Sequence, residues 1–181
     1  RPGLRALIEQ AGLENREISA DQVAYILVPR INAAGRMESP DKAVRLLISE
    51  SPEEAGSLAG KICEDNENRR KIESEIFEKV EERFAAEPSL LCDRVLVVEG
   101  DDWHHGVIGI VAARVVERFG KPCIVISRSG GEARGSGRSV EGFSLFDAVF
   151  SCRDLLTRFG GHPMAAGLSM PSEQIGEFRR R

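Results

Sequence analysis

The sequence has few of the residues from which disulfide frameworks, zinc sites and aromatic-rich surfaces are built. It contains four cysteines, three histidines, one tryptophan and one tyrosine in 181 residues. No two cysteines form a CxxC pair, and the histidines do not join them at zinc spacing, so a zinc site is not expected. In a chain of this size, widely spaced cysteines indicate reduced, mostly buried thiols in a cytoplasmic protein.

Long apolar runs and a strong charge of one sign are also missing. The longest apolar stretches are a few residues, such as Val95 to Val98, whereas a membrane span needs about 20. The net charge of −4 excludes a uniformly basic nucleic-acid-binding coat but allows a local basic patch. With 41% hydrophobic residues, the chain is expected to fold as one large domain, or as one domain with an attached element.

Both ends of the chain resemble internal positions of a protein. It begins Arg1-Pro2-Gly3 without an initiator Met. It stops at Arg181, inside a segment that Pro171-Ser172 is expected to open as a helix. We therefore expect a fragment of a longer protein, whose catalytic half lies outside this sequence.

Residues 1 to about 88 carry helical signals only. Ser19 to Gln22 has the pattern of a capping box, and the Ser-Pro pairs at 39–40 and 51–52 are typical helix starts. Pro29 is expected to kink or interrupt the helix that begins after Ser19.

A much longer helix is predicted after Ser51. The segment from Lys61 to Ala86 contains no Gly or Pro. Apolar residues form one stripe compatible with three- and four-residue steps, at Leu58, Ile62, Ile72, Ile76, Val80 and Phe84. A helix of roughly 30 residues spans about 45 Å, so we interpret it as a connection between two bodies.

From residue 93 onward the pattern is that of an α/β domain. Residues 94–99 and 122–127 are predicted as buried strands, and an apolar helix over 106–119 ends at Gly120. A strand, helix and strand of this length normally place the two strands parallel. The elements expected next are a glycine- and arginine-rich strand or loop over 131–140, a helix over 145–159 and a strand over 165–170.

The stretch Gly135-Ser136-Gly137-Arg138-Ser139 carries the most chemistry. Its glycines let the backbone approach a ligand and let successive N–H groups converge on an anion. The serine hydroxyls and the guanidinium of Arg138 are phosphate ligands, and Arg128 and Arg134 add positive charge nearby. The same composition is typical of a flexible turn, so the residues alone leave both interpretations open.

Two stretches around histidines leave similar alternatives. Gly160-Gly161-His162 presents a histidine for a phosphate contact or proton handling, or else is a helix C-cap with a packed histidine. His104 and His105 lie between a predicted strand and a helix start, where ligands of α/β sheets bind. Trp103, just before them, either stacks on a base or belongs to the core.

A polar stretch in the helical half is the fourth candidate. Arg30, Asn32 and Arg36 lie among small residues. They permit close approach of another body, or they are the charges of a solvated helix end. No cluster of metal-ligand type and no Ser-His-Asp constellation appears in the sequence, and the acidic residues of the long helix are expected to form a solvated face.

Taken in order, these stretches resemble the RecJ family of bacterial single-strand-specific DNA exonucleases, in the DHH phosphoesterase superfamily. The matching stretches are residues 1–7, 29–37, 103–112, 135–139 and 160–167. Each alone is modest, but five in the family's order and across nearly the whole chain are specific.

The resemblance implies an α/β fold class in which a long helix joins two lobes. Residues 1–50 would be the helical tail of the DHH lobe, 51–88 the connecting helix, and 89–181 the DHH-associated α/β domain with a mixed sheet. The two Mn²⁺ or Mg²⁺ ions of the family would be bound by DHH motifs outside this chain. No metal ligand or principal catalytic residue is therefore expected here, and a later oligonucleotide-binding-fold domain would follow Arg181.

The implied activity is 5′→3′ hydrolysis of single-stranded DNA by two metals, in DNA repair and recombination. This chain would be the substrate-binding part, inactive alone, in a cytoplasmic protein without membrane contact; single-strand-binding protein and repair helicases are the implied partners. The implied substrate contacts are Ser136, Gly137, Arg138 and Ser139 on the 5′-terminal phosphate, Gly160, Gly161 and His162 near the metals, Arg30, Asn32 and Arg36 between the lobes, and, more weakly, His104.

Three alternatives stay open. The first alternative is another enzyme of the superfamily, acting on nano-RNA or phosphoadenosine. The second is a non-catalytic module comparable to the DHH-associated domain of alanyl-tRNA synthetases. The third is a purely structural or interaction role. The length of strand bound, and a preference for tRNA over single-stranded DNA, would distinguish the first two from a DNA exonuclease.

Overall fold

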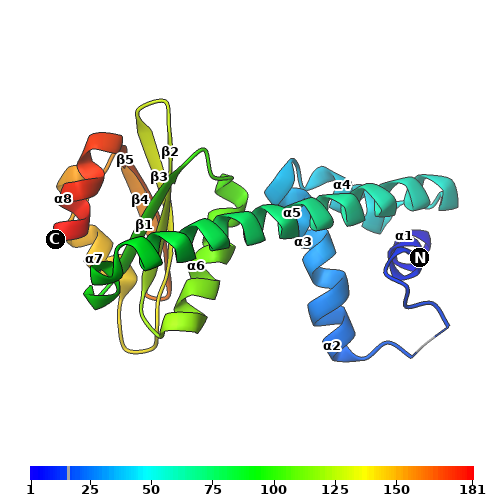
Figure 1. The fold of residues 1–181 in the computed structure, drawn as a ribbon. Helices are drawn as coiled ribbons and strands as arrows, with labels where there is room; N and C mark the ends of the chain where they lie inside the picture. Colours follow the sequence, from blue (N-terminus) through cyan, green and yellow to red (C-terminus); the bar gives the residue numbers. More distant parts are fainter. Residues whose placement is uncertain (16) are drawn as a thin grey trace. The chain divides into compact units, whose positions relative to one another are not determined.

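The computed structural model describes residues 1–15 and 17–181, which form two compact units (Figure 1). One unit comprises residues 1–71 and the other residues 72–181. The boundary falls inside the long helix α5 (Pro52–Ala86), so this helix contributes to both units. The mixed α/β fold class and the long helix predicted from the sequence are confirmed, and the helix has 35 residues rather than roughly 30.

The regular elements of the first unit are helical. They are α1 (Pro2–Gln10), α2 (Ala20–Gln22), a π-helical turn (Val23–Leu27), α3 (Val28–Met37), α4 (Asp41–Ile48) and the first part of α5. The capping box forms as predicted, since the Ser19 hydroxyl accepts from the Gln22 N–H at 3.2 Å and the Ser19 N–H donates to Gln22 Oε1 at 3.0 Å. The chain stays helical through Pro29, but a π turn interrupts the α-helical pattern directly before it, in line with the interruption expected at this proline.

Helices α1, α4 and α5 share the core of this unit. Its most buried side chains include Leu7, Leu46 and Ile62. Helix α1 approaches α4 so closely that a Cβ on Gly3 would lie 1.7 Å from the carbonyl oxygen of Leu46. Lys42 of α4 also reaches α5, where its Nζ lies 2.8 Å from the carboxylate of Asp65.

The second unit is built around a five-stranded mixed sheet. After the last part of α5 come a 3₁₀ turn (Pro88–Cys92), β1 (Leu96–Asp101), α6 (His105–Phe119), β2 (Cys123–Ser129), β3 (Glu132–Arg138), α7 (Leu145–Ser151), β4 (Arg158–His162), β5 (Ala165–Pro171) and α8 (Ile175–Arg180). The strand order is β1-β2-β3-β5-β4. Because β4 is last in this order, it is an edge strand. Strands β1 and β2 are parallel, as predicted, and the other pairs are antiparallel.

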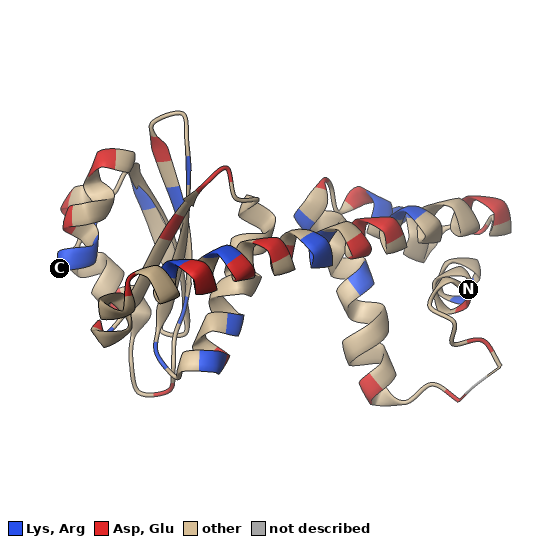
Figure 2. Cartoon of the chain, viewed as in Figure 1, with Lys and Arg blue, Asp and Glu red and all other residues tan. Residues whose placement is uncertain are grey.

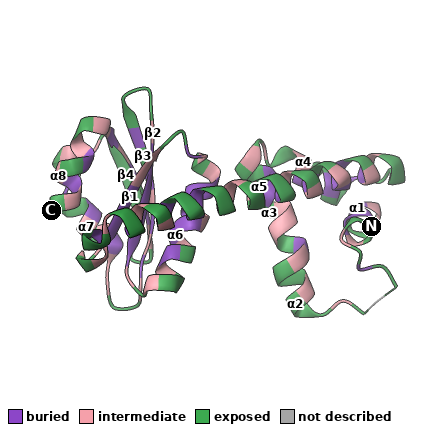
Figure 3. Cartoon of the chain, in the orientation of Figure 1, coloured by how far each residue is buried: buried purple, intermediate pink, exposed green. Residues whose placement is uncertain are grey.

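Helices cover the two faces of this sheet differently. On one face, α7 and α8 enclose an apolar core that includes Ile124, Leu145 and Phe178 (Figure 3). On the other face, α6 packs against β2 and β3. The last part of α5 packs on α6, where the guanidinium of Arg114 lies 3.9 Å from the ring centroid of Phe77. Charged residues of both signs follow one another along α5, as expected for a solvated helix face (Figure 2).

Two expectations are corrected by the structure, and a third that the sequence left open is decided. The helix predicted over 145–159 ends at Ser151, and Phe159 lies in β4, because Thr157 N–H donates to the Ser169 carbonyl at 2.8 Å and starts a strand pairing. The thiols are not mostly buried: Cys123 and Cys152 are buried, whereas Cys92 is exposed and Cys63 is half-buried. Residues 131–140, left open as strand or loop, include β3. Within residues 1–15 and 17–181, no helix is both long and apolar enough to cross a membrane.

Candidate phosphate-binding face

Strand β3 positions the two strongest candidate side chains, Ser136 and Arg138. Residues that alternate along a strand point to one face, and directly paired residues of antiparallel neighbours share that face. The register therefore places three rows of residues across β3, β5 and β4 on a single face. The rows are Arg134, Ser169 and Arg158; Ser136, Gly167 and Gly160; and Arg138, Ala165 and His162. We call these nine residues the open face.

Helix α6 borders the open face on the side of β3. A Cβ added to Gly109 of α6 would lie 2.8 Å from the Ser136 Oγ and 3.0 Å from the Arg138 Nη2. Helix and strand therefore meet closely because residue 109 is a glycine. Beyond this contact, Gly167 and Gly160 are exposed, and a Cβ on either would have no neighbour within 4 Å. The middle row thus offers bare backbone next to a serine hydroxyl.

The guanidinium of Arg138 is held beside that hydroxyl. Its Nη1 donates to the carbonyl of Gly137 at 2.8 Å and to the Oγ of Ser136 at 3.3 Å. Both side chains are half-buried, so their geometry is partly fixed before any ligand arrives. A planar guanidinium next to a hydroxyl is a suitable ligand pair for the oxygens of a phosphate group.

His162 occupies the same row as Arg138, on the exposed edge strand. Its Nδ1 accepts the backbone N–H of Met164 at 3.3 Å. A neutral ring that accepts at Nδ1 carries its proton on Nε2, which can then donate to an anion. His104 is oriented in a similar way, since its Nδ1 caps α6 by accepting the Gly106 N–H at 3.1 Å.

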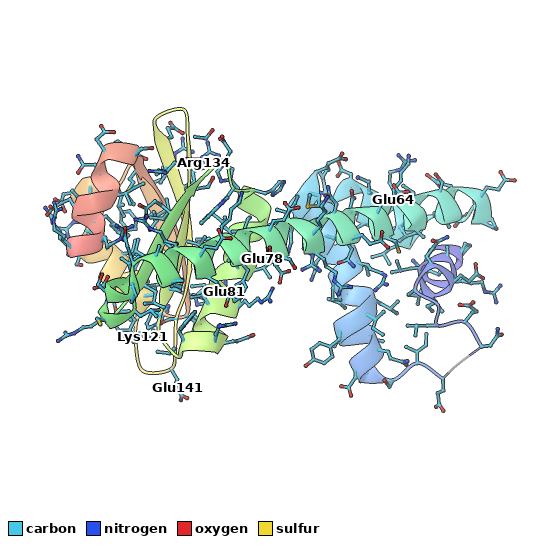
Figure 4. All side chains as sticks on the ribbon, viewed as in Figure 1. Glu64, Glu78, Glu81, Lys121, Arg134 and Glu141 are labelled. Atoms are coloured by element: carbon cyan, nitrogen blue, oxygen red, sulfur yellow. The ribbon has the colours of Figure 1, made fainter. Side chains whose placement is uncertain are left out.

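The pKa of His105, at the start of α6, depends on burial and on the charges beside it. Desolvation lowers the pKa of His105, and the positive charges of Arg134 and His104 lower it further. The lowered pKa favours a neutral ring at pH 7. Arg134 lies on β3 toward the end of the sheet opposite Lys121 (Figure 4).

The glycines of β3 serve a different purpose from the one predicted. Strand β3 pairs with a neighbour on both sides, so its backbone groups belong to sheet ladders and do not converge on an anion. Gly135 and Gly137 face the α7 side. A Cβ there would lie 2.9 Å from Leu168 Cδ1 and 2.6 Å from Leu145 Cδ2, respectively. They let the apolar core pack tightly behind Ser136 and Arg138.

The structure does not bring three other candidates onto the open face. Ser139 is buried, and its hydroxyl donates to the Phe143 carbonyl at 2.7 Å. Gly161 alternates to the opposite face with a φ of 150°, and a Cβ there would lie 2.2 Å from the Ala165 oxygen. Trp103 is a core residue whose ring packs against Gly100, as one of its two interpretations held.

Arg30, Asn32 and Arg36 all lie on α3, in the unit of residues 1–71. Asn32 and Arg36 are one helical turn apart, on the same side of the helix, and both are exposed. Arg30 is half-buried, and its Nη1 donates to the Ile26 carbonyl of the π turn at 2.7 Å. Their predicted role between two lobes stays a prediction.

Arg158 and Ser169 are members of the open face that the sequence did not reveal. The spacing of Arg158, Gly160 and His162, which alternate along a strand, could have indicated β4 and its exposed face. The prediction of a helix up to Phe159 concealed it.

The described part of the chain offers no metal centre of its own. Among residues 1–15 and 17–181, no group of three His, Cys, Asp or Glu side chains is arranged to hold a metal ion. A cavity of about 410 Å³ lies on the α7 and α8 side, lined by Arg94, Val97, Leu145 and Phe178 among others, away from the open face.

Comparison with known proteins gives a consistent result. Residues 92–181 match the model of the DHHA1 domain. The chain is 42% identical over 183 residues to the single-stranded-DNA-specific exonuclease RecJ of Bacillus subtilis, and 34% identical over 196 residues to that of Escherichia coli. All of this chain aligns in both cases, but it covers only 23% and 33% of those proteins.

Solved structures agree with the sequence comparison. A crystal structure of RecJ from Thermus thermophilus in complex with Mn²⁺ superposes on 99% of this chain with a TM-score of 0.85 and 34% identity, covering 26% of that protein's chain. A second RecJ crystal structure, bound to manganese, superposes on 99% with a TM-score of 0.83 and 32% identity, covering 43% of its chain.

Proposed function

We propose that the chain is the substrate-binding part of a single-stranded-DNA exonuclease. Two findings support this proposal: residues 92–181 belong to the DHHA1 domain family, and the whole chain is homologous to one part of RecJ. Its role in that protein is to hold the phosphate at the 5′ end of the strand. One observation carries this role: Ser136 and Arg138 lie side by side, and the rest of the Ser136 row, Gly167 and Gly160, is bare glycine backbone.

The residues divide the work of recognition. Arg138 and Ser136 bind the terminal phosphate through charge-assisted hydrogen bonds. Gly167 and Gly160 let the strand come close to the sheet, and the Nε2–H of His162 donates to a phosphate oxygen. A few convergent donors suffice for a protein that must release the strand after each cut, which is compatible with a net charge of −4.

Hydrolysis itself is assigned to other parts of the whole protein. The relatives' structures contain Mg²⁺ or Mn²⁺, and such ions would polarise the phosphate and activate water in the whole enzyme. We assign binding rather than a metal-dependent step to this chain; among its described residues no group of three His, Cys, Asp or Glu side chains is arranged to hold a metal ion. On the same homology we place the whole protein in the cytoplasm, in DNA repair and recombination, with single-strand-binding protein and repair helicases as partners.

Fluorescence anisotropy with two short thymidine oligonucleotides tests this function. They are identical except that one carries a 5′-phosphate and the other a 5′-hydroxyl. The chain should bind the phosphorylated strand roughly ten- to hundredfold more tightly at low salt, because a charge-assisted hydrogen bond contributes about 1.5–3 kcal/mol. Arg138→Ala should abolish this preference.

Arg94→Ala is the matched control. It removes the same charge from an exposed position that borders the cavity on the other side of the sheet. The preference should survive in this variant. Equal binding of the two strands by the unsubstituted chain would overturn the proposed function.

A further inference from the structure

The proposed function assigns no role to one row of the open face, Arg134, Ser169 and Arg158. Arg134 of β3 is paired with Ser169 of β5, which is paired with Arg158 of β4. The row lies two residues along the strands from Ser136, Gly167 and Gly160, a step of about 7 Å. It therefore extends the phosphate-binding surface in one direction, on the same face of the sheet.

The charges of this row are available to an anion. Arg134 has a side chain that is 58% exposed, and its contact with Glu132 is 3.7 Å long, with the glutamate 74% exposed. Such exposed pairs contribute little to stability and exchange readily for a stronger anion. Arg158 is exposed, and within residues 1–15 and 17–181 no carboxylate lies at ion-pair distance from it.

The spacing of the row suits one occupant. The outer strands β3 and β4 are separated by two strand spacings, about 9.6 Å, so two long guanidinium side chains can converge above Ser169 from either side. A hydroxyl between two forked cations is a recognition set for tetrahedral phosphate oxygens. The row is continuous with the face that binds the strand's end, so the anion is a further part of the same strand.

We infer that Arg134, Ser169 and Arg158 bind an internal phosphodiester of the single strand whose 5′-terminal phosphate is held by Ser136 and Arg138. This assignment rests on the proposed function. It separates two tasks on one face, since the Ser136 row recognises the end of the strand and the Arg134 row binds any strand, whatever its end.

The two tasks are separated by measuring both oligonucleotides against Arg134→Ala and Arg158→Ala in the full 181-residue chain. Each substitution should weaken the phosphorylated and the hydroxyl strand by the same factor, roughly three- to tenfold at low salt. The ratio between the two strands should stay unchanged. The slope of log affinity against log salt should fall by about 0.7 for each arginine removed, because each releases one fewer counterion.

Three variants complete the design. Arg94→Ala controls for the loss of one charge, Arg138→Ala removes the end preference, and Arg158→Lys restores charge without the planar fork. The lysine variant should recover the salt slope but only part of the affinity. Thermal unfolding checks that all variants fold, which is expected because the side chains of Arg134 and Arg158 are exposed.

Each outcome decides the question. Unchanged affinities in Arg134→Ala and Arg158→Ala, with end preference lost in Arg138→Ala, would overturn this inference and leave the proposed function standing. Loss of end preference in Arg158→Ala would also overturn it, because the row would then belong to the terminal site. If the unsubstituted chain bound neither strand, both the proposed function and this inference would be wrong.

Discussion

Gly160 and Gly161 are adjacent in the sequence, yet the structure requires glycine at only one of them for stability. Gly161 has a φ of 150°, and a Cβ there would meet the Ala165 carbonyl. Gly160 has open space around it, on the face that carries Ser136 and Arg138. At the residue scale, one glycine therefore shapes the hairpin and the other keeps the binding surface bare.

Alanine at each position separates these roles. Gly161→Ala should lower the free energy of unfolding by about 1–3 kcal/mol, because the new methyl group is strained and collides with backbone. Gly160→Ala should change stability by less than about 0.5 kcal/mol while weakening binding of single-stranded DNA severalfold. Urea unfolding and anisotropy measure the two effects, and a Gly160→Ala variant with full affinity would argue against close approach of the strand.

The pKa of His105 is sensitive to the charge of Arg134. Arg134 is the second cause, after desolvation, of its lowered pKa. Arg134→Ala should therefore raise the pKa of His105 part of the way toward its ordinary value, as followed by NMR titration of the ring. An unchanged pKa of His105 in that variant would show that burial and His104 set it without Arg134.

The lowered pKa also has a consequence for stability. The unfolded chain takes up this proton more readily than the folded chain does. His105 therefore makes the fold less stable as the pH falls below about 6.5, and it has no such effect above that value.

At the scale of elements, close contacts between helices depend on single glycines. Gly3 of α1 faces the Leu46 carbonyl of α4, where a Cβ would lie 1.7 Å away, whereas Gly60 of α5 has no atom within 4 Å of such a Cβ. Gly3→Ala should cost roughly 1–3 kcal/mol or more because α1 must move away from α4. Gly60→Ala should stabilise by up to about 1 kcal/mol because alanine favours helix.

Thermal or urea unfolding of the two variants checks both signs. Destabilisation by Gly60→Ala would indicate that α5 is not a continuous helix at that point. A neutral effect of Gly3→Ala would mean that α1 does not pack on α4 as described.

The sequence predicted some elements better than others, for physical reasons. Local periodicity predicts the long helix and the strand–helix–strand of residues 94–127, and both are present. Strand β4 was missed because the helix predicted over 145–159 covered its first residues, and because its formation depends on pairing with β5. The same missed strand concealed Arg158. Ser136, Arg138 and His162 were candidates from the sequence, and the strand register places them on one face.

At the scale of the whole molecule, each unit has its own core. Leu46 is fully buried in the core of residues 1–71, and Leu145 in that of residues 72–181. Leu46→Ala and Leu145→Ala should each cost about 2–5 kcal/mol in their own unit. Amide hydrogen exchange should then accelerate mainly within the unit that carries the substitution.

Exchange that accelerates equally throughout the chain in either variant would contradict two separate cores. If the cores are separate, Leu46→Ala should also leave the preference for a 5′-phosphate intact. Anisotropy at a temperature below both unfolding transitions measures this.

The central claim is that the open face of β3, β5 and β4 is where this chain holds the end of a DNA strand. Amide NMR titration with a 5′-phosphorylated thymidine oligonucleotide tests it most directly, because it reports every backbone position at once. The account predicts that the largest shifts occur at residues 134–138, 158–162 and 165–169, and that they shrink around Ser136 when the phosphate is replaced by a hydroxyl. Shifts concentrated around the cavity beside α7 and α8, or absent from β3, would contradict it.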